Sequence, residues 1–130
     1  MSAKKSNFLL TGLTLPDGTA SDLQIANGVI TAIGKTIVSN ADDQVIDLQG
    51  SVVLPGLVDL HTHLREPGKE DAETVLSGSM AAAKGGYVAI SAMANTSPVA
   101  DTAGVVEQVY ALGQSAGFVD VFPIGAVTQG

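Results

Sequence analysis

The chain has 130 residues, 45% of them hydrophobic and 15% charged, and a formal net charge of −7. This composition is typical of a globular protein and excludes a disordered one. The negative charge argues against a surface that binds nucleic acid or an anionic membrane. Cysteine is absent, which excludes disulfide bonds, thiolate nucleophiles and cysteine-ligated metals.

The start of the chain contains basic residues but only three consecutive apolar ones, Phe8, Leu9 and Leu10. That run is too short for the core of a signal peptide. No apolar run elsewhere approaches the length of a membrane span. We therefore expect a cytoplasmic protein.

Residues 1–54 predict a small antiparallel domain of short strands, similar to a β-sandwich. Asp22 to Ile25 alternate polar and apolar side chains, as a half-buried strand does. Asn27-Gly28 is a strong signal for a tight hairpin, with residues 29–34 as the returning strand. This side domain contains no recognisable catalytic motif.

After Pro55-Gly56 the pattern changes to strands that alternate with helices. A stripe of apolar and small residues at helical spacing consists of Val75, Leu76, Ser79, Met80 and Ala83, and Gly85-Gly86 ends that helix. The predicted order is strand 57–63, loop 64–69, helix 70–84, strand 87–93, helix 101–111 and strand 118–124.

This alternation predicts parallel strands joined by right-handed crossovers. We therefore expect an α/β fold in which residues 55–130 form the first three strands and two helices of a (β/α)8 TIM-type barrel. Three strands cannot close such a barrel, so the expected domain is incomplete and belongs to a longer polypeptide. A three-stranded α/β layer that is complete in itself is the alternative.

The only two histidines of the chain, His61 and His63, follow an apolar strand. Residues two apart in a strand point to the same face, roughly 6.6 Å apart along the backbone. Neutral imidazole binds zinc and similar metals, so the pair is a candidate metal site. Arg65 shares their parity if the strand continues that far, and its guanidinium could bind a carboxylate through two hydrogen bonds.

Two plainer interpretations remain open at this point. A His-x-His pair in a surface loop has the same local sequence and binds no metal. Asp59, two residues before His61, is either an acceptor for an imidazole N–H or a solvated carboxylate in a turn. The preceding buried strand and the absence of other histidines favour the metal site.

The segment from Pro55 to Gly68, Pro-Gly-Leu-Val-Asp-Leu-His-Thr-His-Leu-Arg-Glu-Pro-Gly, resembles the end of the first barrel strand in dihydroorotases of the amidohydrolase superfamily. Residues 92–98, Ala-Met-Ala-Asn-Thr-Ser-Pro, look like the second-strand segment of that family, with Ala94 where proline is usual. The N-terminal strands also resemble the side domain of these enzymes.

The resemblance implies that His61 and His63 are ligands of zinc, with one or two ions bound. It implies that Arg65 and Asn95 hold the carboxylate of dihydroorotate, and that His63 and Leu64 border the substrate. The implied reaction is the reversible hydrolysis of dihydroorotate to N-carbamoyl-aspartate in pyrimidine biosynthesis.

The resemblance also implies that the family's remaining metal ligands and its proton-transferring aspartate lie beyond residue 130. No catalytic residue is therefore expected within this chain, which we expect to be inactive alone. The expected partner is the small-molecule substrate, with no nucleic acid or membrane, and a homo-oligomer is plausible.

Two alternatives are kept. An allantoinase or a dihydropyrimidinase-like hydrolase shares the histidine strand, but its neutral ring substrate does not need Arg65. A catalytically inactive structural homologue would need none of His61, His63, Arg65 and Asn95.

Overall fold

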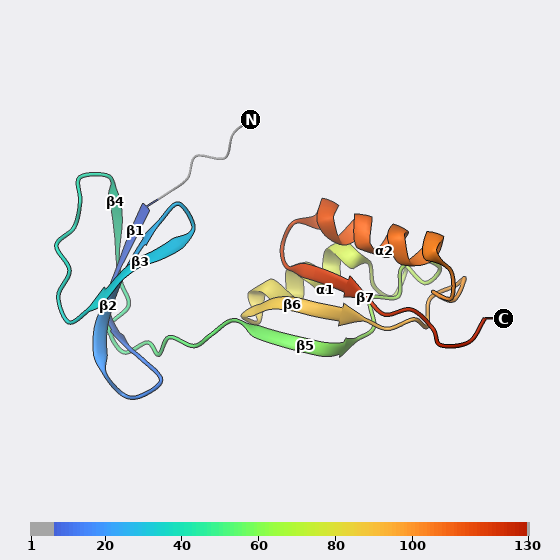
Figure 1. Cartoon of the computed structure of the whole chain (residues 1–130), viewed down its shortest axis with the longest axis horizontal. Coiled ribbons are helices and arrows are strands. Elements are labelled where there is room, and N and C mark those ends of the chain that lie inside the picture. The colour runs from blue at the N-terminus through green and yellow to red at the C-terminus, as the bar shows by residue number, and fades with distance from the viewer. Residues whose placement is uncertain (1–6, 130) are drawn as a thin grey trace. The chain divides into compact units, whose positions relative to one another are not determined.

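The structure, a computed structural model, describes residues 7–129 (Figure 1). Backbone contacts divide the chain into two compact units, one that ends at Pro55 and one that begins at Gly56. This division lies one residue beyond the predicted one. No helix in the described part of the chain is both long enough and apolar enough to span a lipid bilayer.

The first unit is one four-stranded sheet with the strand order β3-β2-β1-β4. Its strands are β1 (Asn7–Thr14), β2 (Ala20–Ala26), β3 (Val29–Gly34) and β4 (Asp43–Asp47). The expectation of a purely antiparallel unit is wrong at β4, which pairs parallel to β1. Residues 35–42 are long enough to carry the chain from β3 across the sheet to its far edge.

The hairpin between β2 and β3 is confirmed. Ala26 pairs with Val29, and the two residues between them, Asn27 and Gly28, have φ angles of 54° and 80°. Two successive positive φ values define the type I′ turn, whose twist matches that of the strands it joins.

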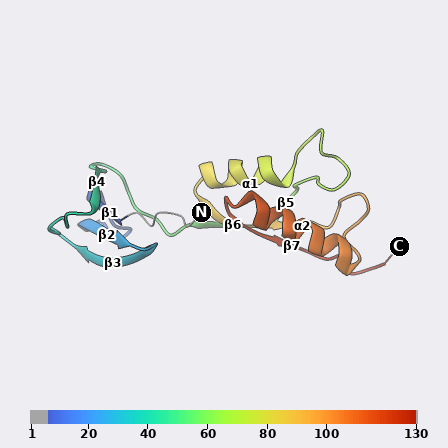
Figure 2. The same cartoon turned by 90° about the horizontal axis from the view of Figure 1, so that it is seen from above.

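The second unit is a parallel sheet in the order β5-β6-β7 with two crossover helices. Its elements are β5 (Leu57–Thr62), α1 (Val75–Lys84), β6 (Tyr87–Ala92), α2 (Ala103–Ala116) and β7 (Asp120–Pro123). Both helices lie on one face of this sheet (Figures 1 and 2). The predicted alternation of parallel strands and helices is thus present.

The core of this unit lies between the sheet and the helices. Val75, Ile90, Val109 and Val121 are each at most 2% exposed, and burial of one such side chain contributes about 1.5–3 kcal/mol. The opposite face of the sheet is uncovered within the described residues, and Leu60 there is 73% exposed.

Two predicted helix boundaries are wrong by five residues each. Helix α1 begins at Val75 rather than at residue 70, because Thr74 and Ser77 form a reciprocal capping box there. Helix α2 continues to Ala116 instead of ending at residue 111. It ends only at Gly117, which adopts a left-handed conformation with a φ of 68°.

Candidate functional site

The candidate site lies where β5 ends, and a β-bulge there sets the direction of its side chains. Asp59 pairs with Ile90 and Thr62 pairs with Ala92, so β5 has one more residue than β6 between these pairs. Ala92 is buried with the core cluster. Thr62, rather than His61, therefore shares the helix-facing side with Ala92, and the bulge turns His61 to the opposite face.

His61 and His63 converge as predicted. Their Nε2 atoms are 3.3 Å apart, and their rings meet edge to face with centroids 5.1 Å apart. Both residues are exposed. Two nitrogens that bind one tetrahedral zinc ion at about 2.0–2.1 Å lie about 3.3–3.4 Å from each other. The pair therefore fits two adjacent ligand positions of one metal ion.

The two histidines do not form a complete metal site. Within residues 7–129 no group of three or more His, Asp or Glu side chains is arranged to hold a metal ion. Catalytic zinc usually has at least three protein ligands. Further ligands must come from outside the described residues if a metal binds here.

Asn95 follows β6 and contacts the second histidine. Its Oδ1 lies 2.9 Å from Nδ1 of His63, although 32 residues separate them in sequence. The carboxyl ends of neighbouring parallel strands lie at the same edge of a sheet, which brings the two side chains together. This proximity is what the strand order predicts.

Asp59 does not accept a hydrogen bond from an imidazole. Its Oδ1 accepts one from the backbone N–H of His61 at 3.0 Å. The bulge between Asp59 and His61 abolishes the shared parity on which the alternative interpretation depended. Asp59 instead stabilises the bulged backbone.

Arg65 lies beyond the strand, so its predicted strand parity does not apply. It has a φ of 65°, a left-handed conformation that costs a residue with a Cβ roughly 1–2 kcal/mol. The residue is half-buried, and its carbonyl accepts a hydrogen bond from the Lys69 N–H at 3.0 Å. Among residues 7–129 no carboxylate pairs with its guanidinium.

The residues on either side of Arg65 anchor this loop to helix α1. Leu64 is 5% exposed and packs in the core cluster, so any contact of Leu64 with a substrate falls to its backbone. Glu66 Oε2 accepts a hydrogen bond from the Val75 N–H at 2.7 Å, at the positive end of the helix. Glu66 is half-buried, and no local sequence signal links it to a helix that begins nine residues later.

The loops after β5 and β6 are also tied to each other. The Ser97 N–H donates to the Pro67 carbonyl at 2.9 Å, and Met93 N–H donates to the Thr62 carbonyl at 2.9 Å. Arg65 and Asn95, the two predicted carboxylate-binding residues, are therefore carried by loops that share backbone hydrogen bonds.

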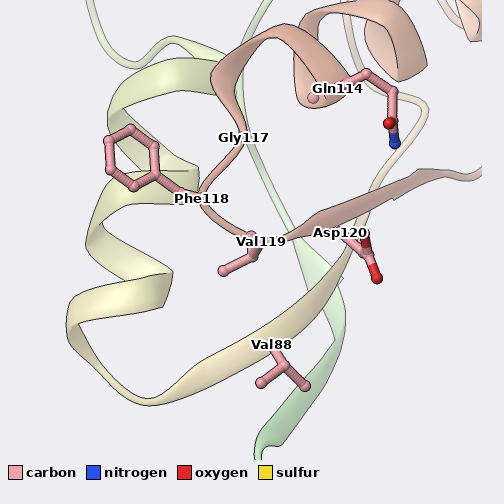
Figure 3. A pocket seen from close by; sticks show the side chains of 7 residues that line it. Val88, Gln114, Gly117, Phe118, Val119 and Asp120 are labelled. Carbon is pink, nitrogen blue, oxygen red and sulfur yellow. The ribbon is translucent and has the colours of Figure 1, made fainter. Parts of the chain in front are cut away.

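A separate hollow of about 220 Å³ lies at the other ends of the strands (Figure 3). It is lined by Val88 at the start of β6, by Val119 and Asp120 at the start of β7, and by the end of α2. In barrels of parallel strands this end serves stability, whereas functional groups gather at the carboxyl ends. We assign no chemistry to this hollow.

Comparison with known proteins identifies relatives that match most of this chain, including the histidine segment. A family model described as dihydro-orotase-like matches residues 50–130. The dihydroorotase of Leifsonia xyli subsp. xyli is 59% identical over 123 residues, which cover 95% of this chain and 28% of that protein. The dihydroorotase of Streptomyces coelicolor is 58% identical over 125 residues, 96% of this chain and 29% of that protein. The chain thus spans less than a third of these relatives.

Among solved structures, the L-hydantoinase (dihydropyrimidinase) from Arthrobacter aurescens matches with a TM-score of 0.71. The match covers 92% of this chain and 28% of that one at 24% sequence identity. At this identity the likeness establishes a shared fold.

Proposed function

This chain belongs to the dihydroorotase-like family, and we propose that the whole protein is a metal-dependent cyclic amidohydrolase. Here the whole protein means this chain together with the remainder that its relatives have. Its proposed reaction is the reversible hydrolysis of dihydroorotate to N-carbamoyl-aspartate, as a cytoplasmic step of pyrimidine biosynthesis.

The observation that carries this proposal is the 3.3 Å separation of the Nε2 atoms of His61 and His63. We propose that both nitrogens bind zinc. A zinc ion, when bound, polarises a carbonyl and lowers the pKa of its bound water from 15.7 to about 7. The two imidazoles are neutral ligands, so they do not reduce the positive charge with which the ion polarises the carbonyl and acidifies the water.

The cationic residue that follows the histidine pair in the sequence supports a substrate that carries a carboxylate. The chain has a net charge of −7, which disfavours an anion unless a local cation offsets it. Arg65 follows His63 by two residues, and within the described residues it has no internal carboxylate partner. We propose that its guanidinium binds the substrate carboxylate through two hydrogen bonds, together with the Asn95 amide.

We also propose that β5, β6 and β7 are the first three strands of an eight-stranded barrel. Exposed apolar side chains on the face opposite the helices, such as Leu60 and Phe122, suit the interior of a closed barrel. The histidines lie at the carboxyl end of β5, where barrel enzymes carry their functional groups. Later strands would supply the missing metal ligands and the general base.

A hydantoinase or dihydropyrimidinase activity is the second candidate, because the chain shares its fold with the L-hydantoinase of Arthrobacter aurescens. These ring substrates offer no carboxylate to Arg65. A catalytically inactive homologue is the third candidate and has no use for a metal.

The test is an assay of the purified whole protein with dihydroorotate and, in parallel, with hydantoin and dihydrouracil. We expect turnover of dihydroorotate that is lost after metal chelation and restored by zinc. Preference for an uncharged ring would support the second candidate, and the absence of stoichiometric metal would support the third. The 130-residue chain alone is expected to show no turnover in the same assay.

A further inference from the structure

We propose that Asn95 is a positioning residue that selects the metal-binding tautomer of His63. This inference rests on the proposed role of His63 as a metal ligand. It assigns to Asn95 a function that acts through another residue, in addition to the proposed contact with substrate.

The direction of the hydrogen bond follows from the chemistry of its two atoms. The Oδ1 of Asn95 is a carbonyl oxygen, which only accepts. At 2.9 Å from it, Nδ1 of His63 must therefore carry the proton. A neutral imidazole has one N–H, so Nε2 of His63 keeps its lone pair. That lone pair belongs to the atom that lies 3.3 Å from Nε2 of His61.

The position of Asn95 is fixed independently of His63. The carbonyl of Ala94 accepts from the Ala100 N–H at 3.0 Å, and the Ser97 N–H donates to the Pro67 carbonyl at 2.9 Å. These bonds close the loop on both sides of Asn95. A carbonyl held in place can orient the imidazole ring and fix its tautomer before any metal arrives.

Within residues 7–129, the same geometry leaves the other end of the amide free for substrate. Oδ1 is occupied by His63, but the two N–H groups of Nδ2 remain as donors. A carboxylate that accepts from Nδ2 would therefore lie one side chain away from a metal ligand. Asn95 would then link substrate orientation to the metal site.

Three variants of the whole protein test this role. Asn95→Leu keeps the size of the side chain but removes the acceptor, whereas Asn95→Asp retains an acceptor oxygen. Thr96→Val is the matched control, since it removes a hydrogen bond from the same loop without touching His63. Each protein is made metal-free, and its zinc affinity is measured by competition with a chromogenic chelator.

We expect Asn95→Leu to weaken zinc binding by about 10–100-fold, the usual effect of losing the hydrogen-bond partner of a histidine ligand. Asn95→Asp should restore most of that loss, and Thr96→Val should leave the affinity unchanged. Equal zinc affinity in the wild type and in Asn95→Leu would overturn the proposal.

A second readout requires no metal and no turnover. In metal-free protein with ¹⁵N-labelled histidine, at a pH where imidazole is neutral, His63 should show a protonated Nδ1 and a bare Nε2. His63→Gln assigns its signals. Asn95→Leu should shift the population toward the Nε2–H form. A wild-type His63 that is already protonated at Nε2 would contradict the inference.

Neither measurement uses dihydroorotate, so the two proposals can fail separately. Asn95-dependent zinc affinity without dihydroorotate turnover would leave this inference standing and remove the proposed substrate. Turnover of dihydroorotate together with a zinc affinity that does not depend on Asn95 would support the proposed substrate and overturn this inference.

Discussion

Gly68 and Ser97, on the two loops of the candidate site, are packed backbone to backbone. A Cβ atom on Gly68 would lie 2.3 Å from the Ser97 carbonyl oxygen, and Gly68 has a φ of 101°. No residue with a side chain satisfies both conditions. The loop that carries Arg65 and the loop that carries Asn95 therefore depend on a glycine at this position.

Gly68→Ala is expected to lower the free energy of unfolding by about 2–5 kcal/mol, from the steric clash and the unfavourable φ together. The control is Gly86→Ala in the same unit, which has a similar positive φ of 85° but nothing within 4 Å of the added Cβ. That variant should lose only the conformational part, about 1–2 kcal/mol. Urea unfolding of the whole protein measures both; equal losses would show that the two loops can move apart without cost.

The caps of the two helices provide a matched comparison of stability. Thr74 accepts a hydrogen bond from the Ser77 N–H at 3.0 Å, whereas Thr102 caps α2 without a side-chain hydrogen bond. Thr74→Ala should therefore cost about 1 kcal/mol and Thr102→Ala much less. Chemical denaturation measures the free energy of unfolding of both variants. A larger decrease in Thr102→Ala than in Thr74→Ala would contradict the capping argument.

Substitution of Arg65 tests the proposed carboxylate contact. A hydrogen bond to a charged group contributes about 1.5–3 kcal/mol, so Arg65→Gln should lower kcat/KM for dihydroorotate by about 10–150-fold. Arg65→Lys keeps the charge but loses the planar pair of donors, and it should recover only part of that loss.

The control for Arg65→Gln is a second substrate, not a variant at a second site. Any residual activity on an uncharged ring such as dihydrouracil should be affected far less by Arg65→Gln than the activity on dihydroorotate. Equal losses on both substrates would indicate that Arg65 supports the loop and does not bind the carboxylate. Unfolding curves of the variants separate these effects from a loss of stability.

The loop after β5 should become less stable in acid, because the carboxylate of Glu70 is then protonated. Its carboxylate accepts a hydrogen bond from the Gly68 N–H at 2.7 Å, which holds the pKa of Glu70 below its ordinary value of 4.5. The folded state thus favours the ionised form. The resulting stabilisation is present above pH 4.5 and is lost as the pH falls through the lowered pKa of the folded state.

The measurement is an NMR titration of the Glu70 carboxyl carbon, whose midpoint should lie below 4.5. Glu70→Gln cannot ionise, so the stability difference between it and the wild type should shrink as the pH is lowered through this range. A midpoint at or above 4.5 would show that the hydrogen bond from Gly68 does not persist in solution.

Local signals in the sequence were sufficient for much of the architecture. The type I′ turn at Asn27-Gly28, the end of α1 at Gly85, and the alternation of parallel strands and helices after Gly56 all depend on contacts between near neighbours in the chain. The convergence of His61 and His63 is local as well, because both residues follow the change of parity and residues two apart then share a face.

Long-range contacts decided the rest of the candidate site. The bulge before Thr62 exists only relative to β6, and it separates Asp59 from the face that His61 occupies. The hydrogen bond from Glu66 to the start of α1 and the burial of Leu64 require the helix to pack beside the loop. The contact between Asn95 and His63 spans 32 residues. A periodic pattern specifies which side of a strand a residue faces, but register and partners depend on the segments that pack against it.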